Sequence, residues 1–145
     1  MSNQVDVAIK TFNDGFSCSQ AVLVSHCEEY GLDSEMALKV AGAFGGGMGH
    51  IGETCGAVTG ALMLLGLKYG KTKAENTESN DRTYATVKEY TDMFKQKHGS
   101  IKCKDLIEFD ISVKEELTKA KEAGVFKTVC PLLVKDSIEM VERLL

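Results

Sequence analysis

The 145-residue sequence predicts an all-α fold, a single-domain helical bundle of about seven or eight helices with a glycine-rich loop before a buried central helix. Apolar residues recur at spacings of three and four along the chain, and the alternation typical of strands is absent. Glycines fall at the ends of the periodic segments or within one loop. A chain of this length forms one domain, residues 1–145, whose core needs neither a metal nor a disulfide for stability.

The first third of the chain predicts three helices. Residues Asn3–Asp14 carry Val5, Ala8 and other apolar side chains on one stripe. Ser17 is a suitable N-cap for a second helix, which we expect to end at Gly31. Ser34 then opens a third helix.

A glycine-rich loop and a central helix follow. Six glycines between Gly42 and Gly52 exceed what a helix or strand interior tolerates, so this segment predicts a loop shaped by its backbone. Residues Thr54–Tyr69 are apolar on nearly every side, which indicates a helix buried among the others. Gly56 and Gly60 share one face of it, where a neighbouring backbone can approach closely.

The second half predicts four more helices separated by polar segments and glycines. The apolar spacing in each of them is again helical. The expected boundaries are a polar connection at Lys71–Arg82, a helix stop at Gly99, caps at Ser100 and Ser112, a stop at Gly124, and Pro131 in the first turn of the last helix.

Charge and hydropathy exclude several classes of partner. The formal net charge is -4 and there is no basic block, which argues against nucleic acid. The longest apolar stretch, Ala57–Leu67, is far shorter than the roughly 20 residues of a membrane span. The N-terminus has no signal-peptide core, so we expect a cytoplasmic protein whose cysteines are thiols. The sequence leaves its redox partner and its oligomeric state open.

The cysteines are the residues most suggestive of chemistry. The predicted boundaries place four of the five at helix N-termini, where free N–H groups and the helix dipole favour a thiolate. That contribution is about 0.3 to 2 kcal/mol, enough only for partial ionisation at neutral pH. His50 and Glu53 are the nearest residues that could add to it, and Cys27 is expected in the core. The four candidate site residues are Cys18, Cys55, Cys103 and Cys130.

The glycine loop also contains a nucleotide-binding pattern. Residues 47–52 read G-x-G-x-x-G, but the pattern follows a predicted helix instead of a strand. We therefore expect no nucleotide site, and interpret the loop as a means for backbone to approach Cys55.

The cysteine pattern resembles a family of redox-active proteins known as C_GCAxxG_C_C, small chains with four characteristic cysteines. Its glycine motif corresponds here to Cys55-Gly56-Ala57-Val58-Thr59-Gly60. The other three cysteines of the pattern match Cys18, Cys103 and Cys130, and Cys27 lies outside it. The resemblance implies a redox role and names no substrate, cofactor or partner.

Three functions are compatible with the sequence. In the first, the four cysteines converge, Cys55 attacks as a thiolate and another cysteine resolves the mixed disulfide. In the second, Cys18, Cys55, Cys103 and Cys130 hold an iron-sulfur centre or zinc. In the third, the chain is a helical interaction module whose cysteines are only structural.

Overall fold

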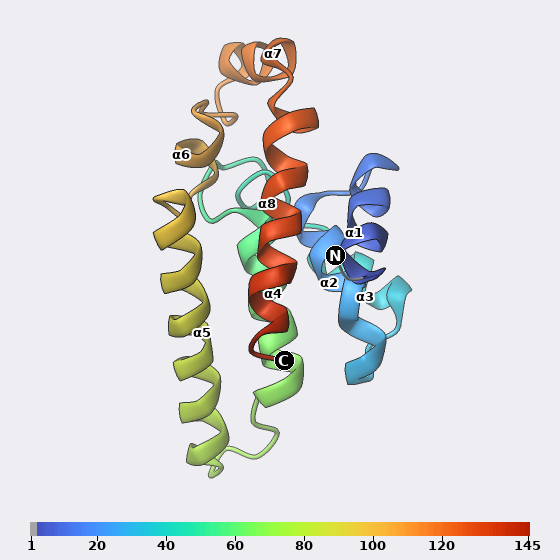
Figure 1. Ribbon diagram of the computed structural model, residues 1–145, viewed down its shortest axis with the longest axis vertical. Helices are drawn as coiled ribbons and strands as arrows, with labels where there is room; N and C mark the ends of the chain where they lie inside the picture. Colours follow the sequence, from blue (N-terminus) through green and yellow to red (C-terminus); the bar gives the residue numbers. More distant parts are fainter. Residues whose placement is uncertain (1–2) are drawn as a thin grey trace.

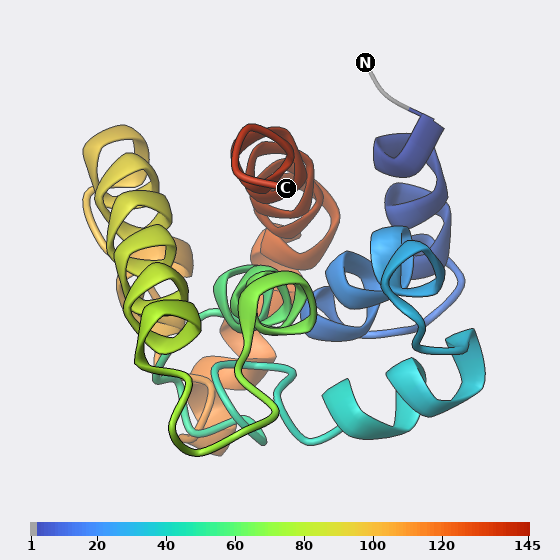
Figure 2. The same ribbon diagram turned by 90° about the horizontal axis from the view of Figure 1, so that it is seen from below.

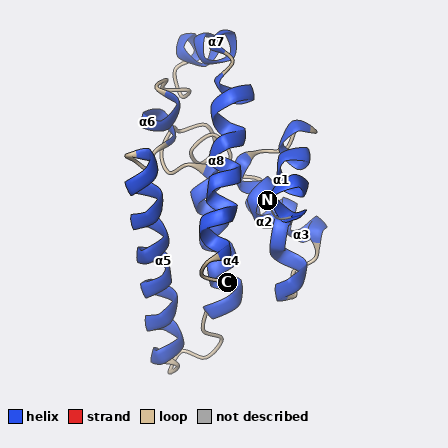
Figure 3. Cartoon of the chain, viewed as in Figure 1, coloured by secondary structure: helices blue, strands red, loops and turns tan. Residues whose placement is uncertain are grey.

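The computed structural model describes residues 3–145, and the described chain is all-α, as predicted (Figure 3). Between residues 3 and 145 no strand occurs, and two segments meet only in an isolated bridge between Thr54 and Lys102. The helices are α1 (Asn3–Asn13), α2 (Cys18–His26), the 3₁₀ helix η1 (Cys27–Tyr30), α3 (Ser34–Ala41), α4 (Gly56–Tyr69), α5 (Thr77–His98), α6 (Cys103–Ile107), α7 (Lys114–Ala123) and α8 (Val125–Glu142).

Helix α4 occupies the centre of the bundle. It packs against α2, α5 and α8, which surround it in the end-on view of Figure 2. Its Leu64 and Leu65 are fully buried, and burial of each such side chain contributes about 1.5–3 kcal/mol. Figure 1 shows α4, α5 and α8 along the long axis, with α1, α2 and α3 on one side and α7 at one end. Among residues 3–145, no helix combines the length and hydropathy needed to span a bilayer.

Glycine allows α2 and α4 to approach closely. A Cβ atom on Gly60 would lie 2.9 Å from the carbonyl oxygen of Ser19 and 2.9 Å from Cβ of Val22. Both distances are shorter than van der Waals contact, so any side chain here would push the two helices apart. Because Cys18 is the first residue of α2, this contact also sets its place relative to α4.

Three predicted boundaries in the second half are wrong. Helix α5 begins at Thr77, well inside the expected polar connection Lys71–Arg82, because Asn76 caps it by accepting the Ser79 N–H. Ser100 accepts the N–H of Lys102 instead of capping α6, which begins at Cys103. Ser112 bonds to Asp110, and α7 starts after Val113 without a side-chain cap.

The last helix begins earlier than Pro131 predicts. Gly124, in the left-handed conformation with φ of 74°, joins α7 directly to α8, which starts at Val125. Pro131 therefore lies inside α8, where it cannot donate to the Lys127 carbonyl. Lys127 is exposed, so water can take the place of the missing donor. Consequently, Cys130 lies inside a helix and not at its N-terminus.

Candidate functional site

The isolated bridge places Cys55 and Cys103 on a common face. Thr54 lies opposite Lys102, the Cys55 N–H donates to the Ile101 carbonyl at 2.7 Å, and the Cys103 N–H donates to the Glu53 carbonyl at 2.6 Å. Successive side chains in extended backbone point to opposite faces. Cys55 follows Thr54 and Cys103 follows Lys102, so both cysteines point to the face opposite that of the bridged pair. We refer to Cys55 and Cys103 as the bridge pair.

The glycine loop between α3 and α4 packs directly on the bridge pair. A Cβ on Gly47 would lie 2.7 Å from Cβ of Cys103 and 2.6 Å from the Glu53 nitrogen. Gly47 has a φ of 70°, a backbone conformation that residues other than glycine rarely adopt. The loop therefore needs glycine here both for its turn and for its contact with the cysteine.

Cys18 is placed by the cap of α2. The Ser17 side chain accepts the Gln20 N–H, and the Gln20 side chain accepts the Ser17 N–H at 2.9 Å, which completes a capping box. Gly45 and Gly56 bring the loop and α4 against this turn, since a Cβ on Gly45 would lie 2.6 Å from Cβ of Ser17. The prediction of Ser17 as the N-cap is confirmed.

Cys130 comes from the interior of α8, four residues after Phe126 on the same face.

Helix α8 is fixed to the start of α4 by a chain of buried hydrogen bonds. The Ser137 hydroxyl donates to the Ala57 carbonyl at 2.6 Å and lies 2.7 Å from the Tyr90 hydroxyl. Ser137 has a single proton, so Tyr90 is the donor to Ser137. This chain ties α5 and α8 to the first turn of α4, next to Cys55.

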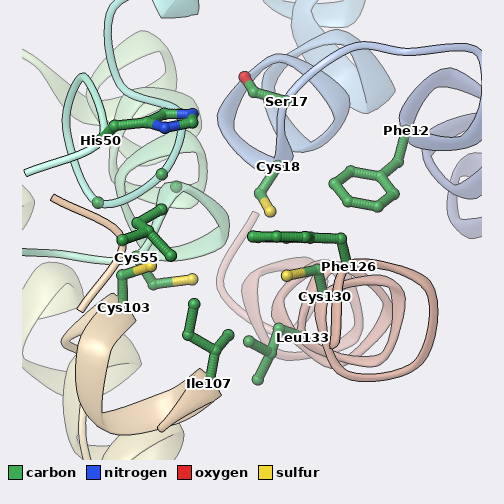
Figure 4. Close-up of a pocket in the computed structure, with 15 residues that line it drawn as sticks. Phe12, Ser17, Cys18, His50, Cys55, Cys103, Ile107, Phe126, Cys130 and Leu133 are labelled. Carbon is green, nitrogen blue, oxygen red and sulfur yellow. The ribbon is translucent and has the colours of Figure 1, made fainter. Parts of the chain in front are cut away.

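All four candidate cysteines line one cavity of about 140 Å³, which we call the thiol cavity. Figure 4 shows the sulfurs of the bridge pair close together on one side, and those of Cys18 and Cys130 on the other side, with the edge of the Phe126 ring drawn between them in this view. We refer to Cys18 and Cys130 as the helix pair. The walls are mostly apolar and include Phe12, Ile107, Ile111, Phe126 and Leu133. The fifth cysteine, Cys27, is fully buried and does not line this cavity.

Burial keeps the bridge pair protonated at neutral pH. It raises the pKa of Cys55 to about 12, although the backbone N–H groups of Ala57 and Val58 lower it. It raises the pKa of Cys103 to about 11, with the Cys130 sulfur adding to the rise. The helix terminus therefore acts on Cys55 in the expected direction, but desolvation is larger.

The two thiols of the helix pair shift each other's pKa in opposite directions. The interaction with the Cys18 side chain lowers the pKa of Cys130. The same interaction raises the pKa of Cys18 well above its ordinary value, and burial adds to the rise. The helix N-terminus does not make Cys18 the thiolate of this pair.

The two residues expected to assist the thiols have different positions. His50 lines the thiol cavity, and its φ of 65° is unusual for a residue other than glycine. Glu53 does not line the cavity, and its carboxylate lies 3.6 Å from the Lys104 ammonium. Its contribution is its backbone carbonyl, which holds Cys103.

The donor atoms suit iron or zinc, but their placement does not form a ligand shell. Among residues 3–145, no three His, Cys, Asp or Glu side chains lie together as a metal site would require. The four thiols instead form two pairs. A shared metal would need the pairs to move toward each other, because four sulfurs must surround one ion at about 2.3 Å.

The aromatic wall of the cavity is not indicated by the sequence. Phe12 and Phe126 follow ordinary helical spacing, and this spacing predicts burial without indicating what a side chain faces. The hydroxyl pair of Tyr90 and Ser137 was missed for the same reason, since 47 residues separate the two.

Comparison with known proteins identifies one family. The family model described as "Putative redox-active protein (C_GCAxxG_C_C)" matches residues 16–144, which is all but the first 15 residues and the last one. No curated protein and no solved structure matches the chain.

Proposed function

The chain belongs to the C_GCAxxG_C_C family of redox-active proteins, and from this premise we propose that it exchanges thiols for disulfides through the helix pair. The observation that carries the proposal is that Cys18 and Cys130 line one mostly apolar cavity, where the interaction between the two thiols lowers the pKa of Cys130. The pair provides one sulfur able to attack and a second in the same cavity to resolve the product. In a reducing compartment such as the cytoplasm, the protein rests with all its cysteines as thiols.

The proposed reaction has two steps. The Cys130 thiolate attacks one sulfur of a disulfide, the bond between the two substrate sulfurs breaks, and the leaving thiolate takes a proton from the solvent. Cys18 then loses its proton and attacks the Cys130 sulfur, which forms the Cys18–Cys130 disulfide and releases the second thiol. In total, two cysteine thiols are oxidised and one disulfide is reduced to two thiols.

This assignment gives the attack to Cys130 instead of Cys55. A pKa of about 12 leaves Cys55 almost entirely protonated near pH 7, and a protonated thiol is a poor nucleophile. Cys130 is the candidate cysteine whose pKa is lowered. The bridge pair then has a later role as a second dithiol. One of its thiolates attacks the Cys18–Cys130 disulfide and breaks that bond, and the other closes a Cys55–Cys103 disulfide, so that Cys18 and Cys130 return to thiols.

Trapping of the mixed disulfide tests this order. Reduced Cys18→Ser protein treated with bis(2-hydroxyethyl) disulfide is expected to retain the reagent on Cys130, because the resolving thiol is absent. Cys130→Ser is expected to lose most of the reaction, by about 100-fold, and Cys27→Ser serves as the matched control with unchanged reactivity. Mass spectrometry of digested protein locates the adduct.

Two results would contradict the proposal. An adduct located mainly on Cys55 or Cys103 would transfer the attack to the bridge pair. Stoichiometric iron or zinc in protein purified without oxygen, with the four thiols unreactive until the metal is removed, would replace thiol exchange by the metal-binding alternative.

A further inference from the structure

A second hollow of about 550 Å³ adjoins the thiol cavity. Phe12, His50 and Phe126 line both, so these side chains form the boundary between them. We call this second space the entrance hollow. Its volume is in the range of 300–1,000 Å³ that is typical of sites for small organic ligands.

The entrance hollow is lined by residues close in sequence to the helix pair. Phe16, which lies two residues before Cys18, contributes to its lining, and so does Lys127, which lies three residues before Cys130. Residues three or four apart on a helix share a face, so Phe126, Lys127 and Cys130 project from neighbouring positions on α8. A molecule in the hollow therefore contacts the part of α8 that carries the proposed attacking sulfur.

The charges in the hollow are opposite to those of the whole chain. The protein has a formal net charge of -4, yet Lys121 and Lys127 line the hollow and no aspartate or glutamate does. Both lysines are exposed, and no ion pair is recorded for either among the described residues. The aromatic side chains of Phe12, Phe16 and Phe126 provide apolar surface beside these two cations.

We infer that the entrance hollow binds a small disulfide that carries carboxylate groups, and presents its sulfur–sulfur bond to Cys130. This inference rests on the proposed function, because the bound molecule is the disulfide reduced in the reaction above. The carboxylates pair with Lys121 and Lys127, and the carbon chains lie on the phenyl rings. The electron balance is that of the two-step exchange, with two cysteine thiols oxidised for each disulfide reduced.

The experiment compares three disulfides of similar length and different charge. These are 3,3′-dithiodipropionate with two negative charges, bis(2-hydroxyethyl) disulfide with none, and cystamine with two positive charges. Each rate of oxidation of the reduced full chain is divided by the rate of the same reagent with free dithiothreitol, which removes differences in intrinsic reactivity. We expect the dianion to react about 10-fold faster than the neutral reagent at low salt, with the difference shrinking as salt is added.

Two double variants test which lysines are responsible. Lys121→Gln with Lys127→Gln is expected to remove most of the preference for the dianion over the neutral reagent. Lys114→Gln with Lys119→Gln removes the same charge from exposed positions of α7 that do not line the hollow, and is expected to keep the preference. Circular dichroism and the neutral rate show whether each variant is folded.

Different results would overturn the entrance hollow and the thiol exchange. Equal normalised rates for the three reagents, or a preference that both double variants reduce equally, would overturn the entrance hollow and leave thiol exchange in place. An absence of reaction with all three reagents would overturn the proposed function itself.

Discussion

The bridge pair and the helix pair contain the same side chain in one cavity, yet their proton affinities differ. Burial without a side-chain hydrogen bond raises the pKa of Cys55 to about 12 and that of Cys103 to about 11. In the helix pair, the interaction between the two thiols lowers the pKa of Cys130 and raises that of Cys18. A neighbouring thiol, more than a helix terminus, therefore decides which cysteine of this cavity has the lowered pKa.

The two pairs also differ in how they are held. Backbone hydrogen bonds between two short segments fix the bridge pair, and the glycine loop covers it. The helix pair depends on the packing of α2 and α8 against α4, because each of its cysteines belongs to a different helix. A change in helix packing is thus expected to disturb the helix pair first.

The largest effect is expected at the contact between α2 and α4. Gly60→Ala places a Cβ at 2.9 Å from the Ser19 carbonyl oxygen, so we expect the free energy of unfolding to fall by about 2–3 kcal/mol. Gly66→Ala is the matched control in the same helix, because no heavy atom lies within 4 Å of its Cβ. Alanine there favours the helix by up to about 1 kcal/mol.

Urea denaturation measures the free energy of unfolding of both glycine variants. The rate of thiol–disulfide exchange is measured on the same proteins. We expect Gly60→Ala also to slow the reaction of the helix pair, since α2 carries Cys18. Equal denaturation midpoints for the two variants would show that α2 and α4 are not in close contact.

The next effect is a pH dependence that belongs to the bridge pair. An unfolded thiol has a pKa near 9, and folding raises that of Cys55 to about 12. Between these values the folded state binds a proton that the unfolded state has released, so stability falls as pH rises. The slope is about 1.4 kcal/mol per pH unit, or roughly 2 kcal/mol between pH 9 and 11.

Cys55→Ser removes this titration and is expected to make the curve less steep above pH 9, where Cys103, with a pKa of about 11, still contributes a slope. Cys130 of the helix pair has the opposite effect. Because its pKa is lowered, its contribution to the free energy of unfolding rises with pH below about 9. Chemical denaturation in reductant at several pH values measures both. If the free energy of unfolding changes with pH at the same slope in the native protein and in Cys55→Ser, Cys55 does not have the raised pKa that distinguishes the bridge pair from the helix pair.

Helical spacing was enough to predict the fold class and the buried α4, because apolar periodicity records which faces are buried. Ser17 likewise predicted local structure, since an N-cap depends on adjacent backbone. The prediction that Pro131 lies in the first turn of the last helix was wrong. Proline suits a first turn, but Gly124 allows α8 to start six residues before Pro131. A single residue type does not reveal which of two compatible positions it occupies.

The grouping of the cysteines was predictable from their number and placement, but their division into pairs was not. The bridge between Thr54 and Lys102 joins segments 48 residues apart, and no local pattern indicates it. Desolvation of Cys55 depends on side chains from several helices, so its place at a helix terminus did not reveal that its pKa is raised. Composition predicted only the net charge of the chain. The turn between α7 and α8 brings Lys121 and Lys127 together at the entrance hollow.

The smallest effect concerns the cap that holds Cys18. Ser17→Ala removes the acceptor for the Gln20 N–H, and Asp33→Ala removes the equivalent acceptor for the Met36 N–H in α3. Each is expected to lower the free energy of unfolding by about 1 kcal/mol. Only Ser17→Ala is expected to slow exchange at the helix pair, by a few-fold, because the first turn of α2 frays and carries the Cys18 thiol away from the Cys130 sulfur. Equal exchange rates in the two variants would mean that Gly45 and Gly56, packed against this turn, hold Cys18 without the cap.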